Sequence, residues 1–259
     1  MEPQIYTWMA QVEDRHWWFA SRRAIVEHFI DRMNLAPDAA ILEPGCGTGG
    51  NFAMLARHGR VYAMDSEDDS LRFATARRIA QVERGILPDQ IPFGSIDFDF
   101  ILMCDVLEHL DDDAAALQGL RARLKPGGWL LMTVPALQWL WSGHDQAHHH
   151  RRRYRASDLG PITQAAGFDV LYLGYFNFIL FPAVAAVRLA QRLTARTPNG
   201  TAAMYTSMPP RIFNTILTRV FSSERRLLDH IHMPFGVSLL LLARPSASTA
   251  IAAAADRAH

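Results

Sequence analysis

The chain has 259 residues, of which 49% are hydrophobic and 20% are charged, a composition typical of a globular protein with one large core or two small ones. Basic and acidic residues number 26 each, so no global charge attracts the chain to nucleic acid or to an anionic membrane. Residues 1–4 lack the features of a signal peptide, and no apolar run approaches the roughly 20 residues of a membrane span. We therefore expect a cytoplasmic protein.

Aromatic residues crowd the segment before the first predicted strand. Trp17, Trp18 and Phe19 lead into residues 22–30, which have helical spacing. One interpretation is that the rings only fasten a first helix to the core. The other is that residues 1–38 fold as a lid over the glycine loop that follows, with aromatic rings against a cation and an arginine paired with a carboxylate.

A glycine-rich loop follows the first predicted strand. The apolar run ends at Glu43, glycines follow at alternate positions, and a helix is predicted next. Glycine suits a turn that visits positive φ and lets a ligand approach the backbone. Gly45, Gly47 and Gly50 fit the dinucleotide pattern G-x-G-x-x-G, whereas Gly45, Gly47 and Gly49 fit the E-x-G-x-G-x-G loop of S-adenosylmethionine (SAM) enzymes, so the loop alone leaves both ligands open.

A second predicted strand, residues 60–65, ends at Asp65. Asp65 lies close to the spacing of about 20 residues at which an acid accepts hydrogen bonds from ribose hydroxyls. That position favours an adenosine ligand of either class. The alternative is an exposed acid that caps the next helix, predicted over residues 66–71.

Three more strands are predicted over residues 82–87, 98–104 and 129–135, with a helix stop and turn at residues 124–128. Alternating strands and helices predict a parallel sheet with right-handed crossovers. Ligands bind beyond the carboxyl ends of such strands, which are here Glu43, Asp65, Leu87, Asp105 and Pro135. Cys46 and Cys104 also fall at strand ends, where we expect reduced thiols that act in packing.

Five ordered motifs together resemble the class I SAM-dependent methyltransferases, most closely the small bacterial enzymes that resemble ubiquinone-biosynthesis methyltransferases. They are residues 43–49, Asp65, residues 87–93, residues 105–109 and residues 124–128, preceded by the lead-in at residues 16–19. The resemblance covers residues 10 to about 245. It implies an α/β fold with a Rossmann-like seven-stranded sheet, mostly parallel with an antiparallel last strand, and helices on its flanks. It also implies SAM as cofactor and S-adenosylhomocysteine as product.

The resemblance implies roles for the residues at the strand ends. The glycine loop cradles the methionine and ribose parts of SAM, Asp65 holds the ribose diol, and residues 85–87 border the adenine. Many members of the family carry an acid beside the adenine, whereas this chain has Ile86 and Leu87, so backbone and apolar contacts are expected there. The predicted cofactor contacts are Trp18, Arg22, Glu43, Gly45, Cys46, Gly47, Gly49, Asn51, Asp65, Ser66, Ile86, Leu87, Asp105 and Val106.

A histidine- and arginine-rich stretch, residues 137–158, follows the fifth strand at the binding edge of the sheet. It is either a solvated basic loop, a metal site or a substrate site. We predict no metal, because adjacent histidines point in different directions and regular ligand spacing is missing. The resemblance includes a His-Asp pair followed by His-x-Arg-Arg-Tyr, which favours substrate recognition. Candidate general bases are then His144, His150 and His109, and candidate acceptor contacts are Asp145, Arg152, Arg153, Tyr154, Tyr175 and Asn177.

The C-terminal third contains a sixth strand at residues 167–173 and a seventh at residues 236–244. Between them we predict a helical insertion, residues 175–235, that serves as ordinary core helices, as a lid, as a dimer surface or as a patch that touches a membrane interface. One domain then covers residues 1–244, and residues 245–259 form a loose tail.

The predicted activity is methyl transfer from SAM to a small-molecule or lipid-like acceptor by in-line displacement. One alternative is an NAD-dependent oxidoreductase on the same sheet, and another is a non-catalytic SAM-binding module. We expect no nucleic-acid partner and a monomer or homodimer.

Overall fold

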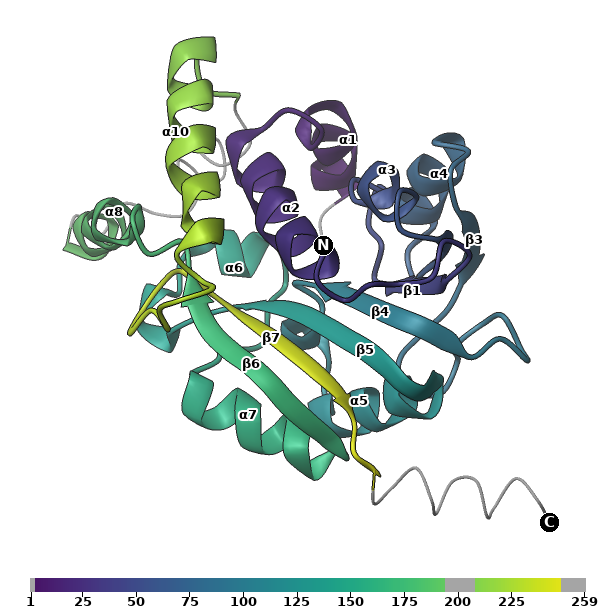
Figure 1. Ribbon diagram of the computed structural model, residues 1–259. Helices are drawn as coiled ribbons and strands as arrows, with labels where there is room; N and C mark the ends of the chain where they lie inside the picture. Colours follow the sequence, from purple (N-terminus) through teal and green to yellow (C-terminus); the bar gives the residue numbers. More distant parts are fainter. Residues whose placement is uncertain (1–2, 194–207, 248–259) are drawn as a thin grey trace.

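The computed structural model describes residues 3–193 and 208–247. Its centre is a seven-stranded sheet with the strand order β3-β2-β1-β4-β5-β7-β6 (Figure 1). The first five strands run parallel, and β7 lies antiparallel between β5 and β6. The predicted sheet, with its antiparallel last strand, is confirmed. The strands are β1 (Ala40–Pro44), β2 (Arg60–Asp65), β3 (Gln81–Arg84), β4 (Phe98–Cys104), β5 (Leu124–Pro135), β6 (Phe168–Phe176) and β7 (Ser238–Pro245).

Helices cover both faces of the sheet (Figure 1). The central strands are apolar on both sides, as a doubly covered parallel sheet requires. In β4, Ile101 and Met103 belong to one buried cluster, whereas Phe100 and Leu102 belong to the other. The first cluster includes side chains of α5 (Asp113–Ala122) and α7 (Ala156–Ala165), and the second includes side chains of α2 (Trp17–Ile30), α3 (Phe52–Leu55), α4 (Asp68–Ala76) and α10 (Arg211–Ser223).

Several element boundaries differ from the prediction; β6, for example, runs to Phe176 instead of ending at residue 173, so the insertion begins after residue 176. Residues 124–128 are not a turn ahead of the fifth strand, because Leu124 already pairs with Phe98 and pairing resumes where Trp129 meets Phe100. The residues between them bulge out of the ladder, which Gly127 permits with a φ of 76°. The third strand is also shorter than predicted and ends at Arg84.

The N-terminal helices and the helical insertion lie on the same face of the sheet (Figure 1). The indoles of Trp17 and Trp18 pack against Phe221 of α10, with ring centroids 6.1 and 5.4 Å apart. The Asn214 side chain of α10 accepts a hydrogen bond from the backbone N–H of Trp17 and donates one to the carbonyl oxygen of Arg15. The insertion therefore fastens the start of α2.

The remaining elements are short or peripheral. They are α1 (Pro3–Val12), α6 (Gly143–Ala147), α8 (Phe181–Leu193) and the 3-10 segments η1 (Leu107–His109), η2 (Gln138–Leu140) and η4 (Glu224–Arg226). Within residues 3–193 and 208–247, each helix is too short or too polar to cross a bilayer. Residues 248–259 of the predicted tail lie outside the described residues.

Candidate functional site

The glycine loop between β1 and α3 is shaped by its backbone. Gly45, Gly47 and Gly49 all have positive φ, at 65°, 55° and 82°. A Cβ atom on Gly45 would lie 2.5 Å from Cγ2 of Val106, so protein packing excludes a side chain there. A Cβ atom on Gly47 would meet only Cε of Met9, at 3.8 Å. The space over Gly47 is therefore open to a ligand.

Asp65, at the end of β2, is tied to this loop. Its Oδ2 accepts a hydrogen bond from the backbone N–H of Gly47 at 2.9 Å, and its Oδ1 accepts one from the N–H of Glu67 at 3.1 Å. Each carboxylate oxygen keeps further acceptor capacity, which suits a diol. Asp65 as a whole residue is 9% exposed, and it lines the cavity described below.

A second buried carboxyl group lies at the end of β1. Glu43 is 2% exposed, and its Oε1 accepts a hydrogen bond from the Asn51 amide at 2.7 Å. No described residue donates a hydrogen bond to its Oε2. Burial raises the pKa of Glu43 to about 8.

Arg22 of α2 reaches across to the end of β4. Its guanidinium forms an ion pair with the Oδ2 of Asp105. Oδ1 of Asp105 accepts a hydrogen bond from the Thr133 hydroxyl at 3.1 Å, so β4, β5 and α2 all meet at this carboxylate. Glu43, Asp65, Asp105 and the glycine loop, residues 45–51, form what we call the glycine wall.

Helix α1 lies over the glycine loop. The buried carboxylate of Glu13 accepts hydrogen bonds from the Thr48 hydroxyl and, at 2.6 Å, from the guanidinium of Arg77. A Cβ atom on Gly50 would lie 2.3 Å from Oε2 of Glu13, which shows how closely the helix approaches. Tyr6 and Met9 of α1 line the cavity together with Trp18 of α2. This placement agrees with a lid role for residues 1–38, which stays a prediction.

Four imidazoles gather on the other side. The ring centroids of His109 and His150 are 4.8 Å apart, those of His144 and His148 are 4.2 Å apart, and His150 lies 5.9 and 5.7 Å from these two. Burial lowers the pKa of His109 to about 4 and that of His148 to about 3, and it also lowers the pKa of His144. These three imidazoles are therefore neutral at pH 7. We call Glu108 and the four histidines the histidine wall.

Asp145 anchors the histidine wall from behind. It is fully buried, closes a capping box with Ser142 at the start of α6, and accepts hydrogen bonds from Nε and Nη2 of Arg153 at 2.8 and 3.1 Å. Its Oδ1 also lies 3.0 Å from Nδ1 of His150. Burial opposes the charge of Asp145, but His150 and Arg153 outweigh it and hold its pKa below the usual range. Asp145 thus orients the His150 ring.

Both walls line one cavity of about 1300 Å³. Of the predicted cofactor contacts, all except Gly49 line it, as do His109, His144 and His150. Among the predicted acceptor contacts, Arg153 and Asn177 line it. Asp145, Arg152, Tyr154 and Tyr175 do not.

The acceptor candidates outside the cavity make internal contacts. Arg152 pairs with Asp113 at 3.1 Å, and the Tyr154 hydroxyl donates to the same carboxylate at 3.0 Å. The hydroxyl oxygen of Tyr175 accepts a hydrogen bond from the N–H of Ala156 at 3.3 Å. These contacts join α5, α7 and β6, and the Tyr154 hydroxyl also lies 3.4 Å from the carbonyl oxygen of Leu107 in η1.

Several lining residues escaped prediction. Tyr6 and Met9 come from a helix with no motif, Glu13 follows that helix directly, and His148 belongs to a run of three histidines. Glu108 had a usable signal, because a carboxylate and an imidazole stand side by side directly after a strand end at Asp105. Both cysteines are free thiols, and Cys46 is buried.

A family model described as a methyltransferase domain matches residues 16–173, more than half of the chain. A probable S-adenosylmethionine-dependent methyltransferase of Mycolicibacterium smegmatis is 26% identical over 162 residues, which is 61% of each chain. A ubiquinone biosynthesis O-methyltransferase of Pseudomonas paraeruginosa is 28% identical over 168 residues, covering 55% of this chain and 70% of that protein. The chain spans about 60% of the length of the first curated relatives that it matches.

Solved structures share the fold. The putative methyltransferase in a complex with the Haloferax volcanii Trm112 activator has a TM-score of 0.59 at 18% identity and covers 93% of this chain and 97% of its own. A putative sarcosine dimethylglycine methyltransferase from Galdieria sulphuraria has a TM-score of 0.55 at 15% identity, with coverage of 88% and 85%.

Proposed function

The chain belongs to the methyltransferase-domain family, whose cofactor is SAM, and on that premise we propose that it transfers a methyl group from SAM to a small-molecule or lipid-like acceptor. The observation that carries this proposal is the single cavity shared by the glycine wall and the histidine wall. When bound, SAM supplies an electrophilic methyl group on a sulfonium, which a nucleophile displaces in line. Proximity and alignment of the two reactants then contribute several kcal/mol to catalysis.

The glycine wall fits the cofactor. The open space above Gly47 leaves room for a ligand against the backbone, and Asp65 presents acceptors suited to ribose hydroxyls. Oε2 of Glu43 is buried without a hydrogen bond from a described residue, and a cationic ligand nearby would stabilise its ionised form. Arg22 would hold the cofactor carboxylate, and Ile86 and Leu87 would border the adenine.

The histidine wall would receive the acceptor. A neutral imidazole can take a proton from a hydroxyl or ammonium group, and His144 is the first candidate base, followed by His150 and His109. We expect Arg153 to hold the acceptor end of the cavity in shape.

The acceptor end of the cavity combines apolar and polar surface. Leu180, Val184 and Val187 line it from the start of the insertion. Asn177 is fully buried there, and neither its amide oxygen nor its amide nitrogen has a hydrogen-bond partner among the described residues. An acceptor with an apolar body and one polar group would fit this surface: the body would pack against the three apolar side chains, and the polar group would hydrogen-bond to the Asn177 amide. Relatives named for ubiquinone biosynthesis and for malonyl-[acyl-carrier protein] O-methylation support that class.

Calorimetry with SAM and, separately, with NAD tests the cofactor. Binding of SAM without binding of NAD is expected, and the reverse result would favour the oxidoreductase alternative. Formation of S-adenosylhomocysteine is then assayed against bacterial lipid and quinone extracts. SAM affinity with no turnover in any extract would favour a non-catalytic binding module.

His144→Ala tests the base. We expect turnover to fall at least tenfold while the Kd for SAM changes less than twofold, because His144 lies on the acceptor side. An equal loss in both would remove the proposed role.

We further propose a peripheral membrane contact through α10. Ile212, Phe213 and Ile216 share one face of this helix and are 73%, 62% and 51% exposed. Such a face can enter a lipid interface. Sedimentation with phosphatidylglycerol vesicles should retain the wild-type chain and release an Ile212→Ser/Ile216→Ser variant, and equal retention would refute the contact.

A further inference from the structure

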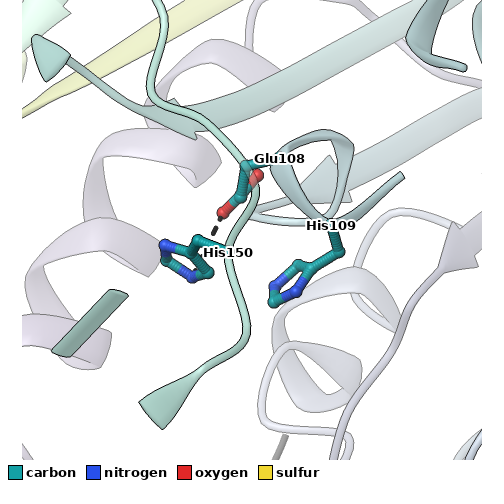
Figure 2. Close-up of side chains that lie close together, drawn as sticks. All are labelled: Glu108, His109 and His150. Carbon is teal, nitrogen blue, oxygen red and sulfur yellow. Dashed lines mark ion pairs between the residues drawn. The ribbon is translucent and has the colours of Figure 1, made fainter. Parts of the chain in front are cut away.

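Glu108, His109 and His150 converge on one point of the histidine wall (Figure 2). Glu108 and His109 are neighbours in η1, whereas His150 comes from the segment after α6. One ligand atom from each lies within 4.8 Å of the others. Atoms about 2.1 Å from a common ion lie roughly 3–4 Å apart, so small side-chain rotations bring these three to that spacing.

The carboxyl group of Glu108 is buried without a hydrogen-bond donor from any other residue in the described part of the chain. Its side chain is fully buried, and no other described residue donates a hydrogen bond to either oxygen. The nearest basic atom is Nε2 of His150, 3.8 Å from Oε1. A buried carboxylate in this situation is costly unless a cation pairs with it.

His150 is oriented as a metal ligand would be. Its Nδ1 faces Oδ1 of Asp145 at 3.0 Å, which leaves Nε2 directed toward Glu108. Metal-binding histidines commonly use their second nitrogen in this way, with a carboxylate that sets the tautomer and the ring orientation. Asp145 is itself held by Arg153.

We propose that Glu108, His109 and His150 bind one divalent first-row transition-metal ion, with Zn²⁺ as the reference case, at the acceptor end of the cavity. Two imidazoles and one carboxylate are a donor set that favours Zn²⁺ or Mn²⁺ over Mg²⁺ or Ca²⁺. Three protein ligands leave coordination positions open, and all three residues line the cavity. The expectation of no metal, made from the sequence alone, did not include Glu108.

The consequence for the reaction rests on the proposed function. An acceptor hydroxyl that reaches the open position would have its pKa lowered, as happens to water on Zn²⁺. Its O–H proton would pass to the His144 imidazole, its oxygen would form the bond to the methyl carbon, and the carbon–sulfur bond of the sulfonium would break. The preferred acceptor is then a hydroxyl rather than an amine.

The test uses the full chain, stripped with a chelator and titrated by calorimetry with ZnCl₂, MnCl₂ and MgCl₂. We expect one equivalent of Zn²⁺ or Mn²⁺ to bind and Mg²⁺ to bind at least 100-fold more weakly. Glu108→Gln should weaken Zn²⁺ binding at least 100-fold, and Asp145→Asn should weaken it 10- to 100-fold. His148→Gln, a histidine of the same wall outside the triad, is the matched control and should change the Kd less than threefold.

Thermal unfolding separates loss of a metal ligand from misfolding of the variant. Without metal, Glu108→Gln should melt no lower than wild type, because it removes a buried carboxylate that no neighbour satisfies. Zn²⁺ should raise the melting temperature of wild type but not that of Glu108→Gln. Absence of Zn²⁺ and Mn²⁺ binding by wild type, or equal binding by Glu108→Gln, would overturn the site. SAM titration of the same samples separates this outcome from failure of the proposed function.

Discussion

The two walls of the cavity are held by different means. The glycine wall consists of strand ends and a loop whose shape lies in the backbone, with three glycines at positive φ and Asp65 bonded to backbone N–H groups. The histidine wall is assembled from η1 and the segment after β5, about forty residues apart, and the buried carboxylate of Asp145 orients it. One wall is therefore sensitive to added volume, and the other to the loss of one charge.

The largest expected effect is on the histidine wall. Asp145→Asn leaves the buried guanidinium of Arg153 without its anion, and breaking a buried pair costs about 3–5 kcal/mol. Urea unfolding should report that loss, and turnover should fall, while SAM affinity in the folded fraction changes less than threefold. Asp111→Asn, whose carboxylate is 78% exposed, is the control and should cost less than about 0.5 kcal/mol. A comparable fall in SAM affinity would mean that the walls are not independent.

Gly45→Ala should break the glycine wall instead. The new Cβ would meet Val106 and would adopt a left-handed conformation, which together cost about 2–4 kcal/mol. SAM affinity should fall at least tenfold in calorimetry. Gly127→Ala has a similar φ but open space around the Cβ, so it should lose stability without losing SAM affinity. If both variants bind SAM like wild type, the loop does not carry the cofactor.

Glu13→Ala tests whether the C-terminal end of α1, which Glu13 follows directly, supports the glycine wall. It leaves the Thr48 hydroxyl and the Arg77 guanidinium without their buried acceptor, at a cost of about 1–2 kcal/mol. We expect SAM affinity to fall several-fold, measured beside Asp14→Ala, whose carboxylate is 61% exposed. Equal affinities in the two variants would show that α1 is not needed over the loop.

The smallest expected effect is a pH dependence at the start of α2. His16 caps this helix by accepting the Trp18 N–H at its Nδ1, and burial lowers its pKa from 6.5 to about 4. The neutral form is favoured in the fold, so its contribution to stability is complete above about pH 6.5 and is lost progressively as pH falls toward 4.

His16→Asn is the matched variant for that measurement, because asparagine caps a helix without titrating. Urea unfolding at pH 7.5 and pH 5 should show a smaller loss for the variant than for wild type. Identical losses would assign the pH dependence to the other buried histidines.

The glycine wall could be predicted from the sequence more completely than the histidine wall. The strand, turn and helix around Gly45, and Asp65 at the next strand end, follow from local chemistry and were found in order. The inward turn of Arg152 and Tyr154 toward Asp113 could not be deduced, because a charged run looks the same whether it faces solvent or packs under η1. Glu108 was overlooked because its importance comes from His150, which lies 42 residues further along.

The clasp between Asn214 and Trp17 joins positions 197 residues apart. On the ribosome, the N-terminal rings therefore wait for most of the chain to emerge before α10 can cover them. Translation that halts before residue 211 would leave Trp17 and Trp18 without their contacts to Phe221, so more apolar surface would be exposed. The packing of α10 against the start of α2 is therefore completed only when most of the chain has been synthesised.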